Sequence, residues 1–253
     1  MSRGCFIVFE GIDGSGKSEQ YGRLTEKLRK DYDVLITSEP TKGMPIGNLI
    51  RQVLYGEEET TEEALALLFA ADRVDHTERK IKPALEEGKI VISDRYVYSS
   101  LAYQSKGMNK ELELDWVKTI NRFAIKPDVV VFLDITPEEG QKRLVDGQIR
   151  VKDHTYFEDI VKQEKIRSVY YRLFNIEKGD LWGFVKEGKK KKEVELSNVN
   201  DTIVLRIDGS LSKDRIHRII NKNIIKILRE KRIEKLKKES NFDNKSLTQF
   251  TGN

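Results

Sequence analysis

The sequence predicts an α/β protein built on a doubly wound, five-stranded parallel sheet with helices on both faces. Two observations support this prediction: the alternation of apolar and amphipathic segments, and the length of the chain. Short apolar runs rich in Val, Ile and Phe alternate with longer amphipathic stretches. Such runs, when helices connect them, favour parallel strands that are covered on both sides. The chain of 253 residues is long enough for one large domain with its own core, and no internal repeat is visible.

The elements follow from these patterns in chain order. The predicted strands are Gly4–Glu10, Val34–Ser38, Ile90–Asp94, Val129–Ile135 and Ile203–Ile207. The predicted helices are Lys17–Lys30, Ile46–Tyr55, Thr61–Glu87, Val97–Gln104, Glu111–Ala124, Pro137–Val145, Tyr156–Glu177 and Lys213–Lys238. Right-handed crossovers then leave only a few topologies.

The segment between the first strand and the first helix reads GIDGSGKS, which matches the pattern G-x-x-x-x-G-K-[ST]. Gly14 and Gly16 allow backbone conformations in which successive N–H groups surround an anion. Lys17 can reach the β- and γ-phosphates of a nucleotide, and the Ser18 hydroxyl suits Mg²⁺. A strand, a loop and a helix in this order place phosphate at a helix N-terminus. The alternative is a tight turn that binds nothing.

The composition argues against several classes of protein. Cys5 is the only cysteine, so we expect no disulfides and a reducing, cytoplasmic location. The chain enters the glycine-rich loop almost at once, and a signal peptide is therefore not expected. No apolar run approaches the roughly 20 residues of a membrane helix, so no membrane partner is expected.

The net charge of +4 is concentrated near the C-terminus, where seven Lys or Arg and three Glu lie between Lys226 and Glu239. Nucleic acid binding would have to depend on this one helix. The simpler interpretation is a solvated helix face, so nucleic acid is not an expected partner.

A second set of polar residues lies in the stretch KIVISDRYVYSSLAYQ. Asp94 ends the predicted strand and can hold Mg²⁺ through its water shell. Arg95 follows directly and offers a guanidinium fork to a phosphate. This edge of an open α/β sheet is where ligands bind. The alternative is an Asp94–Arg95 ion pair at a strand end.

Phe69 and Arg73 are four residues apart and share one helix face. An aromatic ring can stack a base while a guanidinium one turn away donates to its carbonyl. The alternative is a core Phe with a surface Arg.

Together, FEGIDGSGKS, LLFAADR, DRYVYSSLAYQ and IRSVYYRL resemble the thymidylate kinase family in order and spacing. The resemblance covers about Phe6 to Tyr171 and resumes at RIDGSLSKDRIHRII. The DRYxxSxxAYQ pattern is quite specific to this family. The sequence departs from it at Ser38, where many members have an arginine before Glu-Pro, although Lys42 lies nearby as a cation.

The resemblance implies a P-loop kinase that transfers phosphate from ATP to thymidine monophosphate with Mg²⁺, and a homodimer. Asp13 would accept from the sugar 3′-OH, Phe69 would stack on thymine and Arg73 would bond its O4, while Arg95 would clamp the acceptor phosphate. Tyr103 would pack against C2′ and disfavour a ribose. The expected site residues are Gly11, Ile12, Asp13, Gly14, Ser15, Gly16, Lys17, Ser18 and Arg143 for ATP, Phe69, Arg73, Arg95, Ser99, Ser100, Tyr103 and Gln104 for the acceptor, and Ser18 and Asp94 for the metal.

This chemistry needs no general base, because a phosphate monoester with a second pKa near 6 is already a dianion at neutral pH. Positioning and charge neutralisation then drive the transfer. Some family members carry an arginine inside the phosphate loop, whereas others have glycine there and take the cation from a mobile lid. This chain has Gly14, so we expect Arg150, in a lid at about 146–155, to join Lys17 and Arg95 in catalysis. The alternative is that Arg150 only solubilises a loop.

Two other functions stay open at this stage. One is a nucleoside or nucleotide kinase with a different base choice, and the other is a nucleotide-dependent switch or nucleic-acid-binding protein. The three histidines are scattered and expected to be structural: His76, His154 and His217.

The domain prediction is a single kinase domain over residues 1–238. A β-hairpin insertion is expected at about 178–200, with short strands around Phe184–Lys186 and Glu193–Leu196. The polar, aperiodic tail at 239–253 is expected to be disordered.

Overall fold

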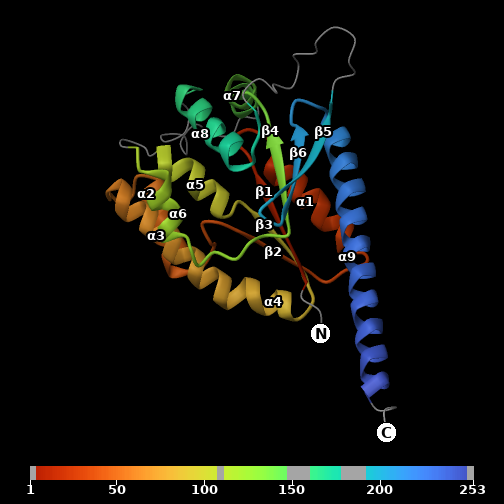
Figure 1. Cartoon of the computed structure of the whole chain (residues 1–253). Coiled ribbons are helices and arrows are strands. Elements are labelled where there is room, and N and C mark those ends of the chain that lie inside the picture. The colour runs from red at the N-terminus through yellow and green to blue at the C-terminus, as the bar shows by residue number, and fades with distance from the viewer. Residues whose placement is uncertain (1–3, 107–110, 147–159, 178–191, 250–253) are drawn as a thin grey trace.

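The structure, a computed structural model, describes residues 4–106, 111–146, 160–177 and 192–249; of 145–146 and 232–249 it describes the backbone only. Figure 1 shows a central sheet with helices on both sides. The strands are β1 (Cys5–Glu10), β2 (Val34–Ser38), β3 (Ile90–Asp94), β4 (Val129–Asp134), β5 (Val194–Val199) and β6 (Thr202–Asp208). Their order across the sheet is β2-β3-β1-β4-β6-β5.

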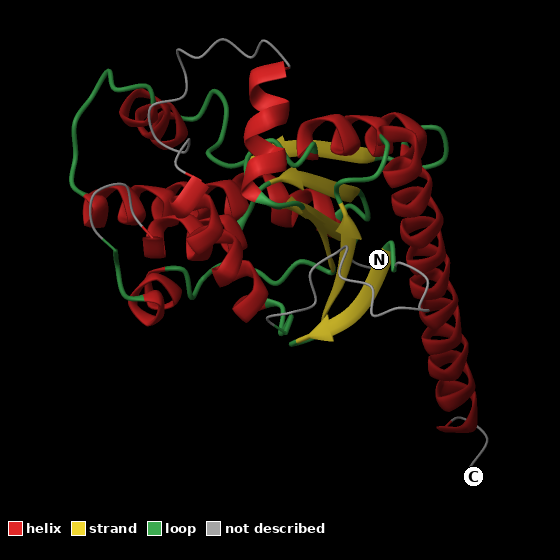
Figure 2. Cartoon of the chain, turned by 90° about the horizontal axis from the view of Figure 1, so that it is seen from above, coloured by secondary structure: helices red, strands yellow, loops and turns green. Residues whose placement is uncertain are grey.

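β1 shows why the sheet needs cover on both faces, because all six of its residues are buried. Successive side chains of a strand point to opposite faces. Ile7 and Phe9 accordingly pack into a core with α1 and α9, whereas Phe6 and Val8 pack into a second core with α4 and β3. A third cluster, between β4, β6, α5 and α8, extends the cover on the face opposite α9. Figure 2 shows the resulting three layers, and the doubly wound α/β fold is confirmed.

Most helices begin and end within a few residues of the predicted positions, but one predicted helix is divided and the last one is longer than predicted. They are α1 (Lys17–Leu28), α2 (Pro45–Leu54), α3 (Glu62–His76), α4 (Lys82–Glu86), α5 (Val97–Lys106), α6 (Leu114–Ile120), α7 (Pro137–Asp146), α8 (Ile160–Leu173) and α9 (Lys213–Gln249). The predicted helix Thr61–Glu87 is divided, because a π-helical turn, η1 (Thr77–Ile81), separates α3 from α4. Pro83 lies one residue further on, after Lys82, and its ring is incompatible with a regular bond to the carbonyl four residues earlier.

The predicted count of five strands is wrong, because β5 adds a sixth strand antiparallel to β6. Asn200 and Asp201 join the two strands, and both have positive φ angles, 51° and 68°. A two-residue turn of this kind matches the twist of a hairpin, and Asn and Asp tolerate it. The strand expected near Glu193–Leu196 therefore exists, but it pairs with β6. Its expected partner, Phe184–Lys186, lies outside the described residues.

α9 begins at a Ser212 cap, whose Oγ accepts from the Arg215 N–H at 3.3 Å. The helix was predicted to end at Lys238, but its backbone stays helical to Gln249. No Pro or Gly interrupts residues 213–249 to end it sooner. In Figures 1 and 2 the end of α9 extends beyond the sheet. Within the described part of the chain, no helix is long and apolar enough to cross a membrane.

Candidate active site

The loop between β1 and α1 packs against the start of α7 through two glycines. Gly14 has a φ of 73°, in the left-handed region that favours glycine. A Cβ on Gly14 would collide with the carbonyl oxygen of Gly140, and a Cβ on Gly140 would lie 2.6 Å from the carbonyl oxygen of Asp13. A longer side chain at position 14 therefore has no room here.

Lys17 opens α1 and is buried, with its ammonium group directed back into the loop. Its Nζ donates to the carbonyl oxygens of Gly11 at 2.9 Å and Ile12 at 2.8 Å, and to Ser15 Oγ at 3.3 Å. Burial, and next the charge of Arg95, lowers the pKa of Lys17 to about 8. The three acceptors of the Lys17 ammonium group are neutral and therefore weak partners for a full charge. A phosphate oxygen can compete with them for this group.

Ser18 and Asp94 meet at the carboxyl ends of β1 and β3. Ser18 Oγ donates to Asp94 Oδ2 at 2.9 Å, while Asp94 Oδ1 is buried without a hydrogen-bond partner among the described residues. In that part of the chain no group of three His, Cys, Asp or Glu side chains could hold a metal by itself. This donor set fits Mg²⁺, which keeps several waters and is usually shared with substrate phosphates.

Arg95 lies between the loop and the neighbouring pocket, and its backbone has an unusual left-handed φ of 66°. Its guanidinium group donates to an Asp13 carboxylate oxygen, to Ser99 Oγ at 3.0 Å and to Tyr103 Oη at 3.2 Å. The alternative of an Asp94–Arg95 pair is wrong, since Asp94 contacts Ser18 instead. Arg95 is thus a partly buried cation beside Lys17.

Glu10 supports the segment that carries Arg95, although no motif in the sequence had singled it out. The carboxylate is fully buried at the end of β1 and accepts from the N–H groups of Tyr96 at 2.9 Å and Ser99 at 3.1 Å. It also accepts from Ser99 Oγ at 2.6 Å and Tyr170 Oη at 2.8 Å. Burial raises the pKa of Glu10. The residue fixes the start of α5 and with it the segment that carries Arg95.

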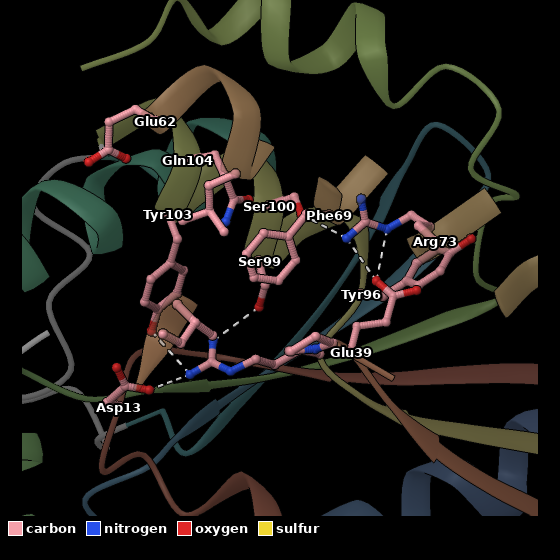
Figure 3. Close-up of a pocket in the computed structure, with 14 residues that line it drawn as sticks. Asp13, Glu39, Glu62, Phe69, Arg73, Tyr96, Ser99, Ser100, Tyr103 and Gln104 are labelled. Carbon is pink, nitrogen blue, oxygen red and sulfur yellow. Dashed lines mark hydrogen bonds and ion pairs between the residues drawn. The ribbon is translucent and has the colours of Figure 1, made fainter. Parts of the chain in front are cut away.

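A pocket of about 180 Å³ opens beside the loop, between α2, α3 and α5. Figure 3 shows its lining side chains pointing inward. Every predicted acceptor residue lines it: Asp13, Phe69, Arg73, Arg95, Ser99, Ser100, Tyr103 and Gln104. Six lining residues were not predicted: Glu39, Pro40, Leu54, Glu62, Leu65 and Tyr96. Glu39 and Pro40 follow β2 at the same sheet edge as Asp94. Their position after a strand end could therefore have identified them as pocket residues.

Phe69 is half-buried and lines the pocket. Arg73 also lines the pocket but is only 1% exposed. The alternative of a surface Arg73 is therefore wrong. The Arg73 Nε donates to Glu39 Oε2 at 2.8 Å, one Nη donates to Ser100 Oγ at 2.7 Å, and the other donates to Asn121 Oδ1. A guanidinium held by three acceptors presents a fixed donor edge to a ligand.

The wall contributed by α5 carries the polar groups of Ser99, Ser100, Tyr103 and Gln104. Tyr103 lies under Arg95, with 4.7 Å between the guanidinium carbon and the ring centroid, and burial raises the pKa of its hydroxyl. Gln104 is buried, and its Oε1 has no hydrogen-bond partner among the described residues. Buried polar atoms are normally paired, so this oxygen can serve a ligand.

Two predicted residues lie elsewhere. Arg143, on α7, does not line the pocket, because its Nη2 donates to the Gly209 carbonyl oxygen at 2.8 Å and its Nε to Glu139 at 2.9 Å. It therefore lies where the loop after β6 meets α7. Arg150 and the expected lid lie outside the described residues, apart from Asp146, the last residue of α7.

A phosphate loop at a helix N-terminus, with a Ser–Asp pair suited to Mg²⁺ and a pocket beside it, is the arrangement expected of a P-loop kinase. A family model described as Thymidylate kinase matches residues 9–198, and the chain belongs to this family. The resemblance found in the motifs is therefore confirmed, and the rival functions are not favoured.

The relatives agree with the family model. A probable thymidylate kinase from Thermococcus onnurineus (strain NA1) is 48% identical over 178 residues, 66% of this chain and 83% of the relative. One from Methanococcus vannielii (strain ATCC 35089 / DSM 1224 / JCM 13029 / OCM 148 / SB) is 45% identical over 196 residues, 75% and 90% of the two chains. A thymidylate kinase from Staphylococcus haemolyticus (strain JCSC1435) is 42% identical over 172 residues, 67% and 83% of the two chains.

Proposed function

We propose that the chain transfers the γ-phosphoryl group of ATP to thymidine monophosphate, giving thymidine diphosphate and ADP. The observation that supports this most is the position of Arg95, which lines the acceptor pocket and also bonds Asp13 of the phosphate loop. A nucleotide whose base lies near Phe69 and Arg73 would direct its phosphate toward Arg95 and the ATP site.

In this proposal, residues 11–18 hold the ATP phosphates and Lys17 neutralises charge on the β- and γ-groups. Arg95 holds the acceptor phosphate, whose oxygen attacks the γ-phosphorus while the bond to the bridging oxygen of ADP breaks. Mg²⁺, held by Ser18, by Asp94 through water and by the phosphates, would supply charge neutralisation when bound. Arg143 would lie near adenine. In the free protein its guanidinium group donates to the Gly209 carbonyl oxygen.

Other pocket residues would bind the base and the sugar of the acceptor nucleotide. Phe69 would stack on the base, the fixed edge of Arg73 would donate to O4, and Tyr103 would pack against the sugar. Gln104 and the serines of α5 complete the pocket wall.

The test of this function is coupled ADP release with a panel of nucleoside monophosphates at saturating Mg·ATP. We expect thymidine monophosphate to give the highest kcat/KM, above the deoxyuridine, deoxycytidine and ribonucleotide analogues. A different preferred base would show that the chain is a nucleotide kinase with another base choice.

Phe69→Ala should raise the KM for thymidine monophosphate more than the KM for ATP. Stacking of a base on an aromatic ring is worth roughly 1–3 kcal/mol in single-strand binders, and we expect the same scale here. Phe69→Leu is the matched control, because leucine fills similar space without a π face. If both variants retain the wild-type KM, the ring acts only in packing.

Arg150→Ala should lower kcat at least about tenfold with little change in either substrate's Kd, because an arginine supplied to the transferring group acts mainly in the transition state. The observation behind this prediction is the contact of Gly14 with Gly140, which leaves no room for a cation at position 14. Lys152, a second cation in the expected lid, and Arg143 on α7 provide the matched comparisons, Lys152→Ala and Arg143→Ala. Wild-type kcat in all three variants would contradict a lid cation.

A homodimer is part of the proposal. Leu67 and Val74 lie seven residues apart on one face of α3 and are 49% and 38% exposed, and Phe123 is 64% exposed. A face of this kind suits a second copy of the chain, and sedimentation analysis would reveal its mass. The cytoplasmic location and the single domain at 1–238 stay predictions.

A further inference from the structure

His76 is a fully buried, titratable side chain to which the proposed chemistry assigns no role. It lies at the last position of α3, one turn after Arg73, and is 0% exposed. Its Nδ1 is 3.0 Å from Glu39 Oε1, and its Nε2 is 2.6 Å from Thr37 Oγ1. The ring thus joins the end of β2 to the segment that lines the pocket.

The chemistry of these partners fixes the direction of each hydrogen bond. A carboxylate only accepts, so His76 Nδ1 carries the proton that bonds Glu39. In the neutral imidazole, Nε2 then accepts from the Thr37 hydroxyl. A second partner of this kind sets both the tautomer and the orientation of a histidine ring. His76 is therefore held in one orientation from both sides.

Glu39 passes this constraint to Arg73. One carboxylate oxygen takes the His76 bond, and the other takes Arg73 Nε at 2.8 Å and Nη2 at 2.7 Å. Both carboxylate oxygens are thus occupied in a place where water does not reach, since the Glu39 side chain is 3% exposed. Figure 3 shows Glu39 directly below the Arg73 guanidinium in the pocket wall.

We infer that His76 is a positioning residue for base recognition: it holds Glu39, and Glu39 holds the guanidinium plane of Arg73 toward the base. The inference rests on the proposed contact between Arg73 and the base. Loss of the His76 bond frees one carboxylate oxygen, so Glu39 can rotate and the Arg73 donor edge moves with it. The consequence falls on acceptor affinity and base choice and leaves the ATP site, on the far side of Arg95, unchanged.

The test compares His76→Phe with His76→Asn. Phenylalanine fills the space but removes both bonds, whereas the asparagine amide nitrogen occupies nearly the place of Nδ1 and retains the bond to Glu39. We expect His76→Phe to raise the KM for thymidine monophosphate about tenfold, by analogy with the outer partners of metal ligands, whose loss costs about 10–100-fold. His76→Asn should stay close to the wild type. The KM for ATP and kcat should change little in either variant.

Base choice gives a second readout that a merely structural role would not move. Cytosine carries an amino group where thymine carries O4, so a displaced Arg73 should reduce the preference for thymidine over deoxycytidine monophosphate in His76→Phe only. Thr202→Val is the matched control, because it removes a buried hydrogen bond, Thr202 Oγ1 to the Pro127 carbonyl oxygen at 2.9 Å, away from the pocket. We expect its thermal midpoint to fall while both KM values remain those of the wild type.

Arg73→Lys separates this inference from the proposed site. If Arg73→Lys alters thymidine monophosphate KM and base preference while folded His76→Phe alters neither, the positioning role is wrong and the site stands. If Arg73→Lys alters neither, the proposed base contact itself is wrong. If His76→Phe and His76→Asn change KM equally and in proportion to their loss of thermal stability, His76 is structural only.

Discussion

Lys17→Ala is expected to leave the fold intact and to remove most phosphoryl transfer. The Nζ is the buried cation at the start of α1, and in the free protein it is held by the carbonyl oxygens of Gly11 and Ile12. Removal of one preorganised donor to a developing negative charge costs about 10²–10³ in kcat, and the loss of a full charge should lie at the upper end. Turnover close to the wild type in a folded variant would exclude the loop from the mechanism.

The pH dependence of ATP binding gives an independent check on Lys17. Burial lowers its pKa to about 8, so the free protein loses this charge as the pH rises from 7 to 9. Phosphates favour the ammonium form, and nucleotide binding must therefore take up a proton above pH 8. We expect the Kd of a non-hydrolysable ATP analogue to rise with pH above this value. Calorimetry in buffers of different ionisation enthalpy would measure the uptake, and Lys17→Arg should abolish it.

The sequence predicts best what depends on local pattern. The five parallel strands are apolar runs, and their observed bounds differ from the predicted ones by at most one residue at either end. The phosphate loop, Asp94 and Arg95 are also local signals, because a fixed order of residue types at strand ends places them at one sheet edge. The family assignment followed from these same motifs and is confirmed.

The rest depends on contacts between distant segments, which no local pattern records. Arg73 is buried because Glu39 and Asn121, 34 and 48 residues away, neutralise and pair it. Glu10 reaches Tyr170 across 160 residues. β5 is half-exposed and polar, so it lacked the apolar run that identified the other strands. α9 continues past Lys238 because nothing in its sequence interrupts it, although its polarity suggested an end.

Arg95→Ala is expected to weaken binding of thymidine monophosphate and to reduce kcat/KM for it by about 10²-fold or more, because a guanidinium fork matches a phosphate bidentately. The side chain is 21% exposed and already bonded to Asp13, Ser99 and Tyr103, so little further ordering is needed when a phosphate arrives. Binding of ATP alone should change far less, since Lys17 and the loop hold its phosphates.

Arg95→Lys is the sharper variant, because it retains the charge but not the fork. If charge alone mattered, lysine would restore most of the activity. We expect it to restore only part, because a single ammonium cannot contact Asp13, Ser99 and the acceptor phosphate together. The measurement is the Kd of thymidine monophosphate by calorimetry beside steady-state kinetics. Full activity in Arg95→Lys would show that only the charge of Arg95 matters. An unchanged Kd in Arg95→Ala would show that the acceptor phosphate does not bind at Arg95.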